Sequence, residues 1–267
     1  MNYLVYYFGH DHHISFMQYL SDYDDWIDFG VLWFAAALLL FNLIYVLWQV
    51  TFKPILSDDL TSKLSVGKIV LFAIGLGIVS FFVRIIFPIG WVLKPVGFQL
   101  GHFPQYIVMF ILGLMVTRNT WIHSITQKDA KRLRIIAACT IFLIFPLFYV
   151  LLTWLKFPSN YFSGEGHWPS LLYALWEQVT GICIMTALIY FGREHLYFSS
   201  HFSKKLSRSA FAVYIFHPIV VISITLLIKN WSIDPAWKLL VAAPFAVVLS
   251  FLLGSALVKI PGVKRII

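Results

Sequence analysis

The stretch LSRSAFAVYIFHPIVVI, residues 206–222, joins a polar start to an apolar run of membrane character. Hydroxyl and basic residues open it, and a single histidine, His217, sits within the apolar part and is followed at once by Pro218. Tyr214 lies three residues before His217, so a helix places both side chains on one face. A titratable group inside a membrane-length apolar run is unfavourable to bury, which makes His217 a candidate functional residue.

The whole chain has the composition of an integral membrane protein. Of its 267 residues 60% are hydrophobic and only 12% are charged, with a mean hydropathy of +0.82. Soluble domains carry about 25% charged residues. The apolar runs are continuous rather than alternating, which predicts an all-α membrane helix bundle and not a barrel. We expect one transmembrane domain, residues 31–267, preceded by an acidic extracytoplasmic tail over residues 1–30.

Seven apolar segments come close to the roughly 20 residues that a bilayer core requires. They are predicted near 31–49, 69–88, 104–118, 135–155, 171–191, 209–228 and 237–257. The third is short unless it starts before Pro104, and proline is compatible with the first turn of a helix.

The basic residues predict the orientation of these segments. Fifteen of the twenty Lys and Arg residues lie in the C-terminal tail and in the connections 50–68, 118–134 and 192–208. The opposite side has four, and Arg84 lies within a span. Cytoplasmic loops carry the excess of positive charge, so the N-terminus is predicted outside and the C-terminus inside. The net charge of +8 then reflects these loops beside the lipid bilayer, and we expect no nucleic-acid partner.

The N-terminal region shows no basic segment before its short apolar run, so no cleavable signal peptide is predicted. His10, His12 and His13 surround Asp11, but this spacing matches no usual ligand pattern, and no metal site is expected. The two cysteines both lie in apolar runs, which predicts buried small hydrophobes rather than a disulfide.

Three residues within the spans form the candidate catalytic group: Arg84, Glu177 and His217. Each has a structural alternative. Arg84 could extend to the outer headgroups, and Glu177 could serve only as an ion pair between helices. His217 could be a neutral core histidine bonded to a neighbouring helix. In the same way, Pro218 could be a kink and Tyr214 a packing residue.

Several enzyme and receptor classes lack support in the sequence. It contains no G-x-S-x-G, no G-x-x-x-x-G-K-[ST] and no H-E-x-x-H motif. A retinal protein needs a lysine near the middle of the last span, and none occurs there. The aromatic content of 18% is concentrated beside the spans, which favours interfacial belts over a ligand groove.

A series of segments resembles the membrane acyltransferase-3 family in matching order. The series comprises VLWF with LLLF in 31–45, RIIFPIG in 84–90, FPQY with FILG in 103–113, WE at 176–177, YIFHP in 214–218 and IPGVKR in 260–265. The family includes glycan O-acetyltransferases and succinyltransferases, and its glucan-succinylating branch is the most similar.

The resemblance implies transfer of an acetyl or succinyl group from a cytoplasmic acyl-CoA-type thioester to a hydroxyl of a cell-surface or periplasmic glycan. It implies location in the inner membrane of a bacterial-type cell, with the thioester as co-substrate and no bound cofactor. His217 would act as base or proton shuttle, Arg84 would stabilise negative charge or hold an acidic substrate group, and Glu177 would orient either one. Tyr214, Trp176 and Tyr106 would contact substrate.

The front of the chain departs from the family pattern. Family members usually begin in the cytoplasm with a helix that carries a basic residue and a histidine, whereas the first span here, 31–49, has neither. The sequence therefore resembles the C-terminal part of the family fold, apparently lacking the N-terminal helices. This leaves open an alternative function, a non-catalytic membrane module or a transport or partner subunit. Thioester hydrolysis would separate an enzyme from such a module.

Overall fold

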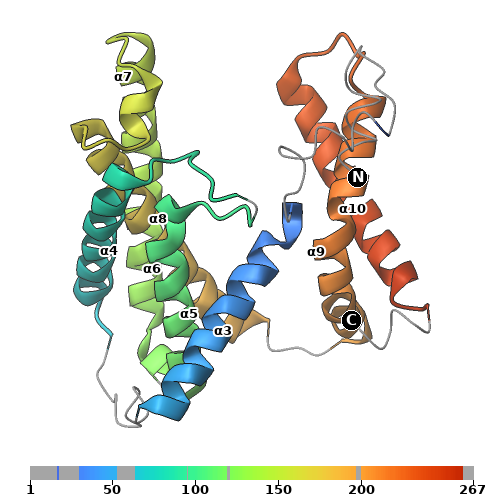
Figure 1. The fold of residues 1–267 in the computed structure, drawn as a ribbon, viewed down its shortest axis with the longest axis horizontal. Helices are drawn as coiled ribbons and strands as arrows, with labels where there is room; N and C mark the ends of the chain where they lie inside the picture. Colours follow the sequence, from blue (N-terminus) through green and yellow to red (C-terminus); the bar gives the residue numbers. More distant parts are fainter. Residues whose placement is uncertain are drawn as a thin grey trace. The chain divides into compact units, whose positions relative to one another are not determined.

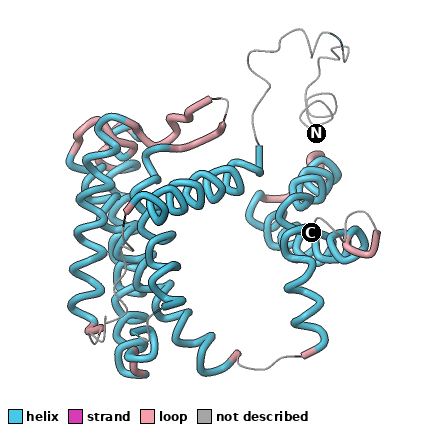
Figure 2. The backbone as a smooth tube through the Cα atoms, turned by 60° about the horizontal axis from the view of Figure 1, so that its bottom comes forward, coloured by secondary structure: helices cyan, strands magenta, loops and turns pink. Residues whose placement is uncertain are grey.

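The structure is a computed structural model that describes residue 17 and residues 30–52, 64–94, 96–118, 121–196 and 200–260. The histidine cluster of the acidic tail and most of the IPGVKR motif lie outside these residues. The regular secondary structure of the described part is helical, confirming the all-α prediction (Figures 1 and 2), apart from one isolated bridge between Leu93 and Phe98. It forms two compact units: a terminal unit, Met1–Phe34 with Phe198–Ile267, and a central unit, Ala35–Tyr197.

The central unit contains most of the helices. In chain order they are α3 (Trp33–Thr51, which starts just before the unit), α4 (Val66–Ile86), η3 (Leu100–His102), α5 (Phe103–Arg118), η4 (Trp121–Ser124), α6 (Gln127–Cys139), the π-helical turn η5 (Thr140–Ile144), α7 (Phe145–Thr153), η6 (Ser159–Phe162) and α8 (Trp168–His195). The terminal unit contains η2 (Gly30–Leu32), α9 (His201–Leu227) and α10 (Pro235–Leu257).

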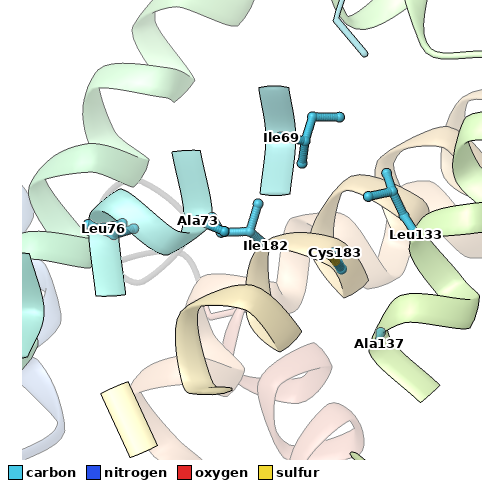
Figure 3. Close-up of a cluster of buried hydrophobic side chains, with 7 residues drawn as sticks. All are labelled: Ile69, Ala73, Leu76, Leu133, Ala137, Ile182 and Cys183. Carbon is cyan, nitrogen blue, oxygen red and sulfur yellow. The ribbon is translucent and has the colours of Figure 1, made fainter. Parts of the chain in front are cut away.

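The core of the central unit lies where α4 and α6 pack along α8 (Figure 3). It consists of Ile69, Ala73 and Leu76 from α4, Leu133 and Ala137 from α6, and Ile182 and Cys183 from α8. Small residues let the helices approach closely. At Gly77, an added Cβ would lie 3.0 Å from the Cα of Leu175, so α4 and α8 are nearly in backbone contact there.

The two cysteines have different environments. Cys183 is fully buried in this core, as predicted, but Cys139 is exposed, so that part of the prediction was wrong. Cys139 follows the buried Ala137 by two residues, and residues two apart on a helix do not share a face. An apolar run alone does not show which of its faces is buried.

Local side-chain hydrogen bonds explain where several helices begin. The Ser65 side chain accepts the Lys68 N–H at the start of α4, and the Asp234 side chain accepts the Ala236 N–H at the start of α10. Reciprocal capping boxes start α6, at Thr126 and Asp129, and α9, at Ser200 and Ser203. These contacts satisfy N–H groups that have no partner in the first helical turn.

In the terminal unit, α9 and α10 pack against each other through small residues. An added Cβ at Gly254 would lie 2.7 Å from Cγ2 of Val213 and 3.3 Å from the carbonyl oxygen of Ser209. The Ser209 side chain is fully buried and donates to the Lys205 carbonyl of its own helix. The small side chains thus set the close approach of this pair of helices.

Six described helical segments are long and apolar enough to cross a membrane: Gly30–Thr51, Val66–Ile86, Gln127–Thr153, Trp168–His195, Ser203–Leu227 and Pro235–Leu257. A shorter apolar segment, Leu100–Val116, lies at the predicted third span. There, α5 begins at Phe103, so Pro104 falls in its first turn, where proline is tolerated. The protein is thus a polytopic membrane helix bundle, and its orientation stays a prediction.

Candidate active site

Arg84 lies in the last turn of α4, and its side chain is fully buried within the central unit, with an exposed fraction of 0%. It does not extend to the headgroups, which removes the structural alternative considered for it. A fully buried guanidinium needs hydrogen-bond partners for its charge and its five N–H groups.

The hydrogen bonds of Arg84 account for three of these five N–H groups. Its Nε donates to the Gly101 carbonyl at 3.2 Å, and its Nη2 donates to Glu177 Oε2 at 2.5 Å and to His102 Nδ1 at 3.1 Å. The remaining nitrogen, Nη1, is buried and has no hydrogen-bond partner in the described part of the chain. Arg84 therefore retains two directed, charged donors.

Glu177 on α8 provides the carboxylate of the ion pair, so the structure brings Arg84 and Glu177 together, which the sequence left open. The carboxylate remains 24% exposed, and its second oxygen lies 3.6 Å from His102 Nδ1. Tyr173 is one turn earlier on α8, and its ring centroid lies 5.9 Å from the Arg84 Cζ. One face of α8 thus presents both an anion and an aromatic ring to Arg84.

His102 is a member of this site that the sequence reasoning missed. It ends η3, immediately before the FPQY motif and just outside the predicted span 104–118. Arg84 can only donate, so the His102 Nδ1 must accept, and the neutral ring then carries its proton on Nε2. Its place in the motif GHFPQY was the available signal, but adjacency to a span does not show which helix it will face.

The backbone around Arg84 leaves no room for additional side-chain atoms. An added Cβ at Gly101 would lie 2.6 Å from the Phe87 carbonyl, and one at Gly164 would collide with the Arg84 carbonyl. The Glu165 N–H donates to the same Arg84 carbonyl at 3.3 Å. Two glycines therefore let η3 and the loop before α8 approach the end of α4.

Trp176 and Tyr106, both predicted to contact substrate, lie near this cluster. The Trp176 Nε1 donates to the Thr140 carbonyl at 2.9 Å, and Thr140 also hydrogen-bonds Thr180 at 2.8 Å between the hydroxyls. Trp176 thus connects α8 to the π-helical turn beside Glu177. The Tyr106 ring lies one turn after His102, with centroids 6.3 Å apart. Contact of either residue with substrate stays a prediction.

His217 and Tyr214 lie on α9, in the terminal unit. Pro218 has no N–H, so the Tyr214 carbonyl lacks its usual helical donor, and His217 Nδ1 approaches that carbonyl to 2.8 Å. A second approach, to the Val213 carbonyl, is 3.2 Å. Carbonyls only accept, so Nδ1 carries a proton, and Nε2 is the acceptor whenever the ring holds a single proton. The Tyr214 hydroxyl donates to the Val31 carbonyl.

These observations define a polytopic membrane protein with a buried Arg–Glu–His group inside its helix bundle. The sequence model of one family, described as an acyltransferase domain, matches residues 1–257, so the chain belongs to the acyltransferase-3 family. This confirms the resemblance, and the match also takes in the acidic segment at the N-terminus. Comparisons with curated proteins and with solved structures gave no match. The protein is, in general terms, a membrane acyltransferase.

Proposed function

We propose that the protein transfers an acetyl or succinyl group from a cytoplasmic acyl-CoA-type thioester to a hydroxyl of an extracytoplasmic glycan, in the inner membrane of a bacterial-type cell. Family membership and the apolar helices support the general reaction and the membrane setting. The thioester is a co-substrate, and the proposal requires no bound cofactor.

The observation that carries the proposal is the buried, unpartnered Nη1 of Arg84. Acyl transfer passes through a tetrahedral intermediate whose oxygen becomes negatively charged. Preorganised donors in a buried site stabilise this charge far better than water-exposed ones. In the proposal, the two N–H groups of Arg84 Nη1 bind the oxyanion, and Glu177 holds the guanidinium in place through its 2.5 Å contact.

Each bond and proton of the proposed reaction can be followed in turn. The acceptor hydroxyl oxygen attacks the thioester carbonyl carbon, forming a C–O bond, and loses its proton to a base. The C–S bond then breaks, and the departing thiolate takes up that proton. On the family resemblance, His217 is proposed as the base or proton shuttle, and its Nδ1–H form leaves Nε2 able to accept a proton. His102, whose Nε2 carries a proton, is a second donor to the oxyanion.

The ring positions and hydrogen bonds of three aromatic residues suggest how each would contact substrate. Tyr106 stands beside His102 and would face the acyl or acceptor group there. Trp176 has its N–H engaged by Thr140, so it would offer only its ring. Tyr214 similarly has its hydroxyl bound to Val31, and it would contact substrate through its aromatic edge.

The test is thioester turnover by the purified full chain in liposomes, with acetyl-CoA or succinyl-CoA and a glycan acceptor, measured as free thiol released. The variant Arg84→Lys can keep an ion pair with Glu177 but has no Nη1 arm. We expect its kcat to fall about 10²- to 10³-fold, the usual effect of removing an oxyanion donor. The matched control is Arg193→Lys, since Arg193 forms its ion pair with the exposed neighbour Glu194.

Unchanged kcat in Arg84→Lys would refute the assigned role. If the unmodified protein releases no thiol from either donor, the alternative of a non-catalytic membrane module replaces the proposal.

A further inference from the structure

Two open pockets lie along the boundary between α4 and α5 in the central unit, with volumes of about 620 and 690 Å³. The first runs from Leu64 and Val116 to Phe72, and also touches α8. The second runs from Phe72 to Phe87 and Leu100. Because they share Phe72, we treat them together as the α4/α5 slot. Each volume is in the range of small-molecule sites.

The lining of the slot is almost entirely hydrocarbon. Among the described lining residues, Lys68 is the charged one and Thr186 is the one with a hydroxyl. The Thr186 hydroxyl donates to the Ile182 carbonyl at 2.8 Å, so its proton is already used. The walls therefore offer a ligand apolar contact and little hydrogen bonding, which suits an alkyl chain.

Glycines create the open space. Gly75 and Gly113 both line the slot, and an added Cβ at either would meet nothing within 4 Å. Gly77, by contrast, is pressed against Leu175 of α8. Two residues of α4 that lie on different faces thus have opposite environments: α4 is held tightly by α8 and leaves its other side open toward α5.

One end of the slot lies beside the elements that carry the candidate active site, although Arg84, His102 and Glu177 themselves do not line it. Val83 and Phe87 line it and flank Arg84 in the sequence, while Leu100 and Phe103 line it and flank Gly101 and His102. Lys68 marks the other end. From Lys68 to Val83 the rise along α4 is about 22 Å, which is much of the roughly 30 Å hydrocarbon core of a bilayer.

We propose that the α4/α5 slot binds the hydrocarbon chain of an amphiphilic acceptor whose hydroxylated head group lies at Arg84 and His102. The inference rests on the proposed function and narrows its acceptor to a glycan carried on a membrane-embedded chain. We place the head at the end lined by Val83, Phe87 and Leu100, because that end adjoins the last turn of α4 and η3, which carry Arg84 and His102. The opposite end offers a single lysine.

The test uses the full chain in nanodiscs and a dodecyl glucoside whose chain carries a photoreactive diazirine. Binding is measured without any thioester, and the crosslinked residues are mapped by mass spectrometry. Crosslinks are expected on α4 and α5. Gly75→Leu and Gly113→Leu place side chains in the slot at positions where the added Cβ meets nothing within 4 Å, and each should weaken binding about tenfold, the effect of excluding two buried CH₂ groups.

The matched control is Gly67→Leu. Gly67 lies on α4, is exposed, has open space around it and does not line the slot, so binding should be unchanged. Wild-type binding by Gly75→Leu and Gly113→Leu, or crosslinks outside α4 and α5, would overturn the inference. So would a loss of binding in Lys68→Gln, since it would place the polar head at the opposite end, as for a phospholipid of the inner leaflet.

Turnover separates this inference from the proposed function. In the active protein, kcat/KM should rise from glucose through octyl to dodecyl glucoside, and Gly75→Leu should flatten that rise. If the protein is active but its kcat/KM does not depend on the alkyl chain length, the binding of a chain in the slot is refuted and the proposed function is not. A protein that binds the probe but never releases thiol would refute the proposed function alone.

Discussion

Arg84 in the central unit and His217 in the terminal unit are both polar residues within apolar spans, yet they are held in opposite ways. Arg84 is bonded across elements, to Gly101 and His102 of η3 and to Glu177 of α8. The Nδ1 of His217 bonds carbonyls of its own helix, those of Val213 and Tyr214. The first arrangement depends on how three elements pack, whereas the second depends on one local feature, the missing N–H of Pro218.

The two histidines differ accordingly. His102 Nδ1 accepts from Arg84, so its Nε2 is the protonated nitrogen, while His217 Nδ1 donates to a carbonyl, so its Nε2 is the acceptor. One ring is therefore prepared to donate a hydrogen bond and the other to take a proton. The partner of one ring nitrogen decides the chemistry of the other.

Removing the guanidinium should lower the free energy of unfolding the most, because the bonds between α4, η3 and α8 at this site all depend on Arg84. Arg84→Met leaves Glu177 without its cationic partner and should lower the free energy of unfolding by about 3 kcal/mol, the lower end for a buried pair since Glu177 is partly exposed. Denaturant unfolding in detergent micelles measures this change. The double variant Arg84→Met with Glu177→Met should recover much of the loss. If His217→Met is equally destabilising, the contrast between the two regions fails.

Crowding the backbone behind Arg84 should have the next largest effect. In Gly164→Ala the new methyl group collides with the Arg84 carbonyl, so the loop must move and the free energy of unfolding should fall by about 1–3 kcal/mol. Gly181→Ala is the control, since an added Cβ there meets nothing within 4 Å. A thermal unfolding series on both variants measures the difference, and equal stabilities would show that the loop does not support Arg84.

The hydrogen bond from Trp176 of α8 to Thr140 of the π-helical turn should contribute less to the free energy of unfolding. Trp176→Phe keeps the ring packing but removes the donor to the Thr140 carbonyl, which should lower the free energy of unfolding by about 1 kcal/mol. Trp168→Phe, at an exposed position on the same helix, serves as the control and should change little. Similar losses in both variants would mean that the hydrogen bond does not matter to the placement of α8.

The smallest effect on stability is expected from Pro218→Ala, and it tests the local arrangement directly. Alanine supplies an N–H that competes with His217 for the Tyr214 carbonyl, so the fraction of the ring protonated at Nδ1 should fall. Nitrogen-15 NMR of labelled histidine measures this fraction. Pro244→Ala, in the interior of α10, should leave the His217 signal unchanged. An unaltered His217 signal in Pro218→Ala would show that proline does not set the tautomer.

The residues of the site show how far sequence reasoning reaches. Arg84 and Glu177 were singled out because each is a charge within a long apolar run, and the structure joins them. His102 was missed because it lies in a short helical turn outside the predicted span, where a polar residue is ordinary and does not indicate a functional site. Cys139 was misplaced because apolar composition does not reveal which face of a helix is buried.

The sequence by itself determined the membrane helices, their approximate bounds, the family and the His-Pro pair, because run length, caps and a missing N–H are local properties of the chain. Only the tertiary structure decided that Arg84 is buried with an Nη1 that has no partner among the described residues, that His102 joins it, and that a slot remains between α4 and α5. Those features depend on how closely separate segments approach at Gly77, Gly101 and Gly164. Such approaches arise between residues far apart in the chain, and no local pattern encodes which surfaces meet.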